Sequence, residues 1–193
     1  MNTASTDWSQ PREPGGLSTA KTKLFWLAQG LRLLSSSYTA WVLVRIVQWW
    51  TDSEKVIKNM GPYLGRNLSA LTAGPRMTAM ALDLVAWLLL LAAVVCCWRS
   101  LGYLIKQLNF THSMARLLTW AGWLGAMCQL LTLLTRPLQS YLMTAHLAAG
   151  EQVFRWAFYP QDLLGTLLCG VILCFSYLIA WAVDIADENR GFV

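Results

Sequence analysis

The feature that most constrains this chain is a set of long apolar runs, each long enough to cross a lipid bilayer as a helix. A span needs about 20 mostly apolar residues to cross ~30 Å of hydrocarbon. Two of the four runs are nearly free of polar residues: 80–98, which contains LVAWLLLLAAVVCCW, and 163–183. The third, 115–135, is interrupted by Gln129 and small residues, and the first, 24–50, contains two arginines and three consecutive serines.

Composition agrees with a chain that lipid solvates. Hydrophobic residues make up 56% of the sequence and charged residues only 13%, whereas soluble domains have about 25% charged residues. The chain also contains 11 tryptophans, a residue that concentrates at membrane–water interfaces. We therefore predict an all-α integral membrane protein, a bundle of four transmembrane helices, with the lipid bilayer as its main partner.

The four runs divide the chain into an arm and a membrane domain. Residues 1–20 contain no apolar run, which predicts a disordered cytoplasmic arm. Residues 21–193 form the predicted four-helix transmembrane domain. Lys21 and Lys23 come late, and no small-residue cleavage site follows a short apolar core, so no signal peptide is predicted and the first run is expected to remain as a span.

Basic residues near the spans predict the orientation, because Lys and Arg favour the cytoplasmic side. Lys21 and Lys23 directly precede the first run, and Arg99 and Arg116 flank the short loop between the second and third. We predict a multi-pass protein of a bacterial inner membrane, with both termini in the cytoplasm. The net charge is +5, but the basic residues are scattered over every loop and form no dense cluster. Nucleic acid is therefore not an expected partner.

Ionisable residues within the runs predict two structural charge pairs inside the membrane. A charge in hydrocarbon costs ~2.5–3.5 kcal/mol on insertion scales and usually finds a partner inside the bundle. Arg45 and Asp83 are expected at similar depth near the outer side, and Arg32 and Asp184 near the inner side. The alternative is that each arginine extends to its nearest interface and pairs with lipid phosphate.

Small residues within the runs lead to two further expectations about helix packing. Residues 35–37, three serines, either let a second helix approach closely or break the first run. A break would leave residues 20–34 as an amphipathic helix in the membrane plane. Close helix packing is also expected at the glycines of the third and fourth runs: Gly122, Gly125, Gly165 and Gly170.

The residues that usually carry chemistry do not form a recognisable site. All five cysteines lie in predicted spans, where free cysteine behaves as a small apolar side chain. His112 and His146 lie in loops expected on opposite sides of the membrane, so they are not expected to share a metal. No zinc-protease, nucleophile-elbow or phosphate-loop motif is present. We predict no catalytic, cofactor-binding or metal-binding residue, no cofactor, and a protein that is not an enzyme.

Two short stretches resemble a known family. The ending ADENRGFV is similar to that of small bacterial membrane proteins classified as the domain of unknown function numbered 2975, at Asp187, Glu188, Asn189, Phe192 and Val193. The stretch NFTHSMARLLTWAGW resembles the same family at a second set of positions: Phe110, Thr111, Arg116, Leu117, Gly122 and Trp123. The resemblance implies four spans in a bacterial inner membrane and supplies no reaction.

The amino-acid sequence supports two hypotheses about function. The first is a non-enzymatic membrane protein that acts through protein–protein interaction, as a regulatory, accessory or protective partner or as a homo-oligomer. The second is a small oligomeric transporter or channel. Transporters often carry ionisable groups near the membrane midplane. Here the charges lie toward the span ends, which favours the first hypothesis.

Overall fold

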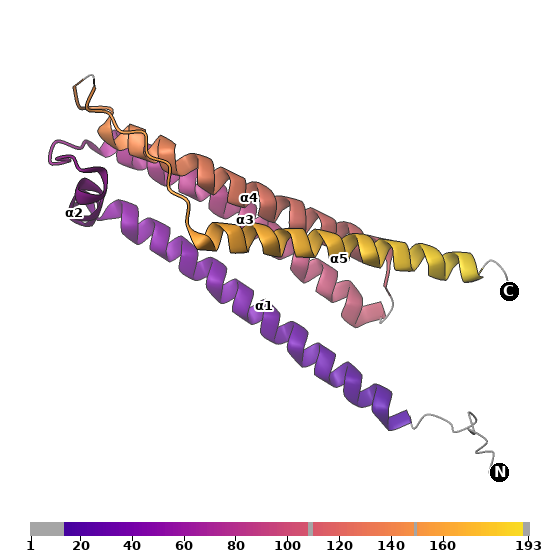
Figure 1. Ribbon diagram of the computed structural model, residues 1–193. Helices are drawn as coiled ribbons and strands as arrows, with labels where there is room; N and C mark the ends of the chain where they lie inside the picture. Colours follow the sequence, from indigo (N-terminus) through magenta and orange to yellow (C-terminus); the bar gives the residue numbers. More distant parts are fainter. Residues whose placement is uncertain (1–13, 108–109, 149, 191–193) are drawn as a thin grey trace, which may run out of the picture.

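The computed structural model describes residues 14–107, 110–148 and 150–190, which form α-helices and no strand (Figure 1). Of the predicted arm, residues 1–13 lie outside the described residues, and 14–20 are already helical because the first helix begins at Pro14. The all-α prediction is therefore confirmed for the described part of the chain. The helices are α1 (Pro14–Thr51), α2 (Ser53–Leu64), α3 (Ala73–Gln107), α4 (His112–Thr144) and α5 (Pro160–Arg190).

Three of the described helices, α3, α4 and α5, are long and apolar enough to cross a membrane. They contain the predicted runs 80–98, 115–135 and 163–183 and extend beyond them at both ends. α1 has 38 residues but is not among the helices that meet this criterion, since arginines and serines dilute its apolar run. By length and composition the described chain thus has three candidate spans, rather than the expected four.

The long helices alternate in direction, so the Pro14 end of α1 and the Arg190 end of α5 lie at the same end of the molecule (Figure 1). We call this the terminal end. The opposite end, which comprises residues 49–83 and 136–162, is the capped end. α1 packs on α3, α3 on α4, and α4 on α5. The described helices therefore form an open row, with α1 and α5 at its edges. The predicted bundle of four transmembrane helices is confirmed only in part, since the described long helices pack together but three of them qualify as spans.

α1 is a single unbroken helix, so residues 35–37 do not interrupt it. The hydroxyls of Ser35 and Ser36 donate to carbonyls of the preceding turn, which satisfies them within the helix. Ser35 also accepts a hydrogen bond from Trp98 Nε1 of α3 at 2.8 Å. The expectation of close helix approach at these serines is confirmed. The alternative, a break at these serines that separates residues 20–34 from the rest of the run, is wrong.

Small residues bring α4 and α5 together. A Cβ added to Gly122 would lie 2.7 Å from the Leu173 side chain, and one added to Gly125 would lie 2.8 Å from Cys169 Sγ. At Gly165 an added Cβ would collide with the Gln129 amide. These three glycines are close-packing positions, as predicted. The fourth, Gly170, has open space around it.

The capped end holds the buried apolar cluster of the described chain. α2 lies across this end, begun by Asp52, whose carboxylate accepts from the Lys55 N–H, and ended by Gly65 in the left-handed conformation. Hydrogen bonds from the Lys55 side chain and backbone lower the pKa of Asp52. α2 places apolar residues on one side, over the ends of α1, α3 and α4. The cluster comprises Trp50, Val56, Leu64, Leu68, Ala79 and Met143.

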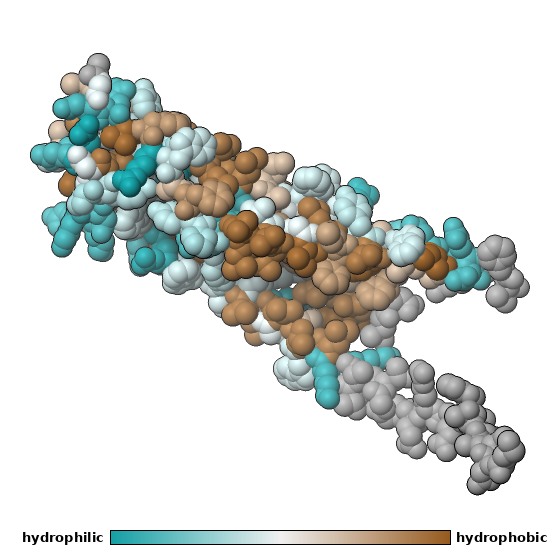
Figure 2. Space-filling view, viewed as in Figure 1, coloured by the Kyte–Doolittle hydropathy of each residue, from teal (hydrophilic) through white to brown (hydrophobic). Residues whose placement is uncertain are grey.

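The surface has an apolar middle and polar ends. Figure 2 shows hydrophobic side chains along the middle of the molecule and hydrophilic ones at the capped end and at the tip of α5. Much of each candidate span is uncovered by protein, including large side chains such as Leu88, Met127 and Phe175. Such a belt is energetically reasonable where lipid or another apolar helix covers it.

Candidate functional site

The first polar cluster of the capped end is built around Asp83 of α3. Its carboxylate accepts hydrogen bonds from Trp50 Nε1 of α1 and from Gln139 Nε2 of α4, both at 2.7 Å. Gln139 also donates to the Ala79 carbonyl at 3.3 Å. Because these bonds join three helices, Asp83 holds α1, α3 and α4 in one register at this depth.

A second cluster joins α4 to α5 through a buried ion pair. Arg136 donates from its two terminal nitrogens to the two carboxylate oxygens of Asp162, at 2.5 and 2.7 Å. It also donates to the Ala157 carbonyl at 2.9 Å and lies over the Tyr159 ring, 4.7 Å from its centroid. Asp162 is only 3% exposed. This paired fork geometry is the strongest arrangement of a guanidinium and a carboxylate.

The connection between α4 and α5 folds back over these clusters. The backbone N–H of Arg155 donates to Ser140 Oγ at 3.0 Å. The Arg155 guanidinium lies 4.5 Å from the centroid of the Tyr63 ring and donates to the Tyr63 carbonyl, and burial raises the pKa of Tyr63. A small pocket of about 320 Å³ remains beneath the connection. Its lining includes Trp49, Tyr63, Arg136, Gln139 and Tyr159.

The charges of these two clusters already have protein partners. The Asp83 carboxylate has an indole and an amide donor, and the Arg136 guanidinium has a carboxylate, a carbonyl and an aromatic ring. A side chain whose hydrogen bonds are satisfied internally gains little from a further ligand. The capped end is therefore suited to fixing the helix ends relative to one another.

The predicted pair of Arg45 and Asp83 is not among the ion pairs that the described residues form. The antiparallel arrangement places α1 beside Asp83, as expected. The α1 side chain that contacts Asp83 is Trp50, five residues after Arg45. Arg45 is exposed and lies 6.0 Å from the centroid of the Trp41 ring. The helical rotation between Arg45 and Trp50 turns the arginine away from α3.

Arg32 and Asp184 are not joined either, because their helices lie at opposite edges of the row. Arg32 donates from Nη2 to the Trp98 carbonyl of α3 at 2.8 Å. Asp184 instead lies 3.6 Å from His112 Nε2 at the start of α4, and Asp187 lies 3.7 Å from the same nitrogen. Arg32 and Asp184 both lie toward the terminal end, but α1 packs on α3 and α5 on α4.

The ion pair of Arg136 and Asp162 was not predicted, although the sequence contains a signal for it. Arg136 directly follows the run 115–135, and Asp162 directly precedes the run 163–183. Both therefore lie at the same end of antiparallel spans, and the argument from depth that paired Arg45 with Asp83 applies to them equally. Both fall in predicted loops, because the third apolar run stops before Arg136. α4 continues through Pro137 to Thr144 and thereby carries Arg136 on a helix.

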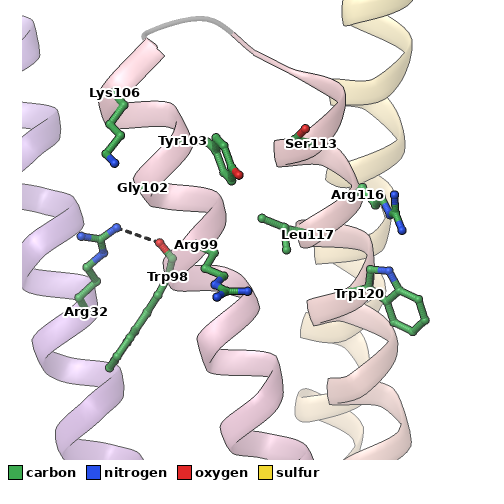
Figure 3. Close-up of a pocket in the computed structure, with 10 residues that line it drawn as sticks. All are labelled: Arg32, Trp98, Arg99, Gly102, Tyr103, Lys106, Ser113, Arg116, Leu117 and Trp120. Atoms are coloured by element: carbon green, nitrogen blue, oxygen red, sulfur yellow. Dashed lines mark hydrogen bonds between the residues drawn. The ribbon is translucent and has the colours of Figure 1, made fainter.

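The terminal end contains a groove of about 1130 Å³ across α1, α3 and α4 (Figure 3). Arg32 and Lys106 lie on the side toward α1, Arg99 and Tyr103 lie between α3 and α4, and Arg116 lies at the far edge over α4. None of the described residues that line the groove is acidic. The lining is Arg32, Trp98, Arg99, Gly102, Tyr103, Lys106, Ser113, Arg116, Leu117 and Trp120.

Comparisons with models of protein families, with curated proteins and with solved structures found no match to this chain. The geometry of the two ends and the open row of helices are therefore the features that bear on function.

Proposed function

We propose that this chain is a non-enzymatic protein of a bacterial inner membrane that crosses the bilayer four times and acts by binding another membrane protein through α1. Both termini lie in the cytoplasm in this proposal. The resemblance to the domain of unknown function numbered 2975 is consistent with that architecture. One observation carries the interaction: an exposed arginine on α1 lies level with the apolar run of a neighbouring candidate span.

The position of α1 beside α3 supports its role as the fourth span. Its 38 residues extend about 57 Å, and it runs antiparallel to α3 with the polar groups of one face bonded to that helix. Trp50 bonds Asp83, Ser35 accepts from Trp98, and Trp87 Nε1 donates to the Thr39 carbonyl at 2.9 Å. These partners lower the cost of placing a polar helix in lipid.

The register between α1 and α3 sets the depth of Arg45. Trp50 lies beside Asp83 and Ser35 lies beside Trp98, so equal steps along the two helices keep them matched. From these two contacts Arg45, five residues before Trp50, is level with about Leu88. From the contact between Thr39 and Trp87 it is level with about Ala81, so it lies within the part of α3 between residues 81 and 88 of the apolar run 80–98. A guanidinium at this depth is costly in hydrocarbon, by ~2.5–3.5 kcal/mol on insertion scales.

The outward face of α1 is thus poorly matched to lipid and well matched to a polar helix. Arg45 and Gln48 are exposed on it, among large apolar side chains such as Tyr38, Trp41 and Val44. We infer that the partner is a transmembrane helix that presents a carboxylate or another acceptor to Arg45 at the level of the apolar run, with apolar side chains around it. Such a contact satisfies the charge and extends the open row by one helix.

Photo-cross-linking in native membranes tests this proposal. A photoreactive amino acid replaces Val44 on α1 or, as a matched control, Val171 on α5; both valines are 49% exposed. We expect a protein adduct of discrete mass from position 44 and none from position 171. Addition of Arg45→Leu should abolish the adduct at position 44 while the protein remains in the membrane. An adduct with a second copy identifies the partner as this chain itself.

Two results would contradict the proposal. The first is labelling of lipid alone from position 44 as well as from position 171. The second is an adduct at position 44 that persists unchanged with Arg45→Leu. The transporter hypothesis has no specific observation in its favour, and it is tested separately by ion flux into vesicles that contain the purified protein. Flux that is independent of any partner would favour it.

A further inference from the structure

The cationic groove of the terminal end differs from the capped end because its charges lack acidic partners among the described residues. Arg99, Lys106 and Arg116 are exposed, and none of them takes part in the ion pairs that described residues form. The nearby carboxylates of Asp184 and Asp187 face His112 instead. Four cations therefore border one groove, and no anion is among the described residues of its lining.

The fourth cation, Arg32, is held in place by the fold. Its Nη2 donates to the Trp98 carbonyl, while its Nε is buried and has no hydrogen-bond partner among the described residues. Gly102 makes room for it, because a Cβ at that position would lie 3.0 Å from Arg32 Nη2. Figure 3 shows Arg32 reaching across from α1 to the backbone of α3. A buried donor without a partner is costly, so the polar groups around Arg32 are incompletely satisfied within the described fold.

The remaining lining is aromatic and apolar, which indicates an amphiphilic ligand. Trp98, Tyr103, Leu117 and Trp120 border the groove between the basic residues. Tryptophan and tyrosine rings at a span end lie at the level of lipid headgroups. Ser113 adds a hydroxyl in the first turn of α4, where the helix dipole also favours negative charge.

We propose that this groove binds the headgroup phosphates of an anionic phospholipid, with a preference for a headgroup that carries two phosphates. Basic pockets between transmembrane helices on the cytoplasmic side are known to take such headgroups. In this arrangement Arg32 and Lys106 bind one phosphate on the α1 side, Arg99 binds the second between α3 and α4, and Arg116 adds positive charge at the far edge of the groove. The acyl chains lie along Leu117 and Trp120 toward the apolar belt. This inference rests on membrane insertion with the terminal end in the cytoplasm, but not on the partner of α1.

Native mass spectrometry of the full chain in neutral detergent tests the groove, with diphosphatidylglycerol as the probe. The charge-removing variant is Arg99→Gln with Arg116→Gln, at two exposed positions. The matched control, Lys55→Gln with Lys58→Gln, removes the same charge from exposed positions on α2. We expect saturable binding of one lipid and at least about tenfold weaker binding in the arginine variant, with no change in the control. The conservative pair Arg99→Lys with Arg116→Lys should retain most of the binding.

Three results would overturn the proposal: equal loss in both double variants, equal binding of phosphatidylcholine, or displacement of the lipid by inorganic pyrophosphate at matched concentration. The last result would identify a site for soluble phosphate compounds. Circular dichroism of each variant verifies that its helices are intact, so that a loss of binding cannot result from unfolding. Flotation with neutral vesicles verifies membrane insertion independently. Loss of lipid binding with the adduct at position 44 intact contradicts the groove alone.

Discussion

At the scale of single residues, the chain pairs its inward-facing charges with whichever donors the helix rotation presents. Asp83 has an indole and an amide rather than the expected arginine, and Asp162 has an arginine that falls in a predicted loop. A carboxylate near the membrane needs donors, and neutral N–H groups satisfy it without the burial of a second charge. The end of the molecule toward which a residue lies was therefore easier to predict than its partner.

The ion pair of Arg136 and Asp162 carries a residue-scale prediction. Asp162→Ala leaves the Arg136 guanidinium, whose side chain is 20% exposed, without its carboxylate. Loss of one partner of a buried pair costs about 3–5 kcal/mol, so we expect a large drop in the free energy of unfolding. Titration with sodium dodecyl sulfate in mixed micelles, followed by circular dichroism, measures it.

A surface pair provides the comparison for that prediction. Lys55 lies 2.8 Å from Asp52, but the Lys55 side chain is 66% exposed. Lys55→Ala should change stability by less than about 1 kcal/mol, as is usual for exposed pairs. If Asp162→Ala costs no more than Lys55→Ala, the buried pair does not fasten α4 to α5.

At the scale of helices, α4 and α5 approach closely where one of them has glycine, which has no side chain. Gly122, Gly125 and Gly165 let α4 and α5 meet, and the pattern of small residues in the apolar runs predicted this. Sequence reasoning missed α2, although Asp52 and Gly65 are suitable caps for it. With about three turns, α2 is too short to stand out among runs long enough to span a membrane.

The glycine contacts lead to an element-scale prediction. Gly122→Val places two methyl groups against the Leu173 side chain and forces α4 and α5 apart, so we expect a loss of about 1–3 kcal/mol. Gly170→Ala, in open space on α5, should be neutral or stabilising by up to ~1 kcal/mol because alanine favours the helix. The same unfolding titration compares the two variants. Equal effects would show that the interface does not require glycine.

At the scale of the whole molecule, the row of helices leaves two edges open and keeps both termini at one end (Figure 1). Three helices satisfy the criterion for a span by composition, and an odd number of crossings would put the termini on opposite sides of a membrane. The proposed four crossings agree with the alternating helix directions, since hydrogen bonds join α1 to α3 from Arg32 to Trp50. Topology is therefore the property that most directly tests the architecture.

Reporter fusions measure the topology. Alkaline phosphatase, which is active only in the periplasm, should be inactive when fused after residue 193 and active when inserted at residue 70 of the α2–α3 connection. A fluorescent protein that matures only in the cytoplasm should give the reverse pattern. Phosphatase activity at residue 193 would leave α1 on the membrane surface, with three crossings. Activity at neither position would contradict membrane insertion in this orientation.

The amino-acid order by itself determined where three helices long and apolar enough to cross a membrane lie, and it pointed to three of the glycines at which α4 and α5 pack closely. These properties depend on local composition and on the helical repeat, which a single segment carries. Only the tertiary structure decided that Asp83 meets Trp50, that the helices form an open row, and that four cations border one groove. Those features depend on the rotation of each helix about its axis and on which helices touch, and in lipid many rotations bury similar apolar area. The few polar contacts between helices therefore select the arrangement.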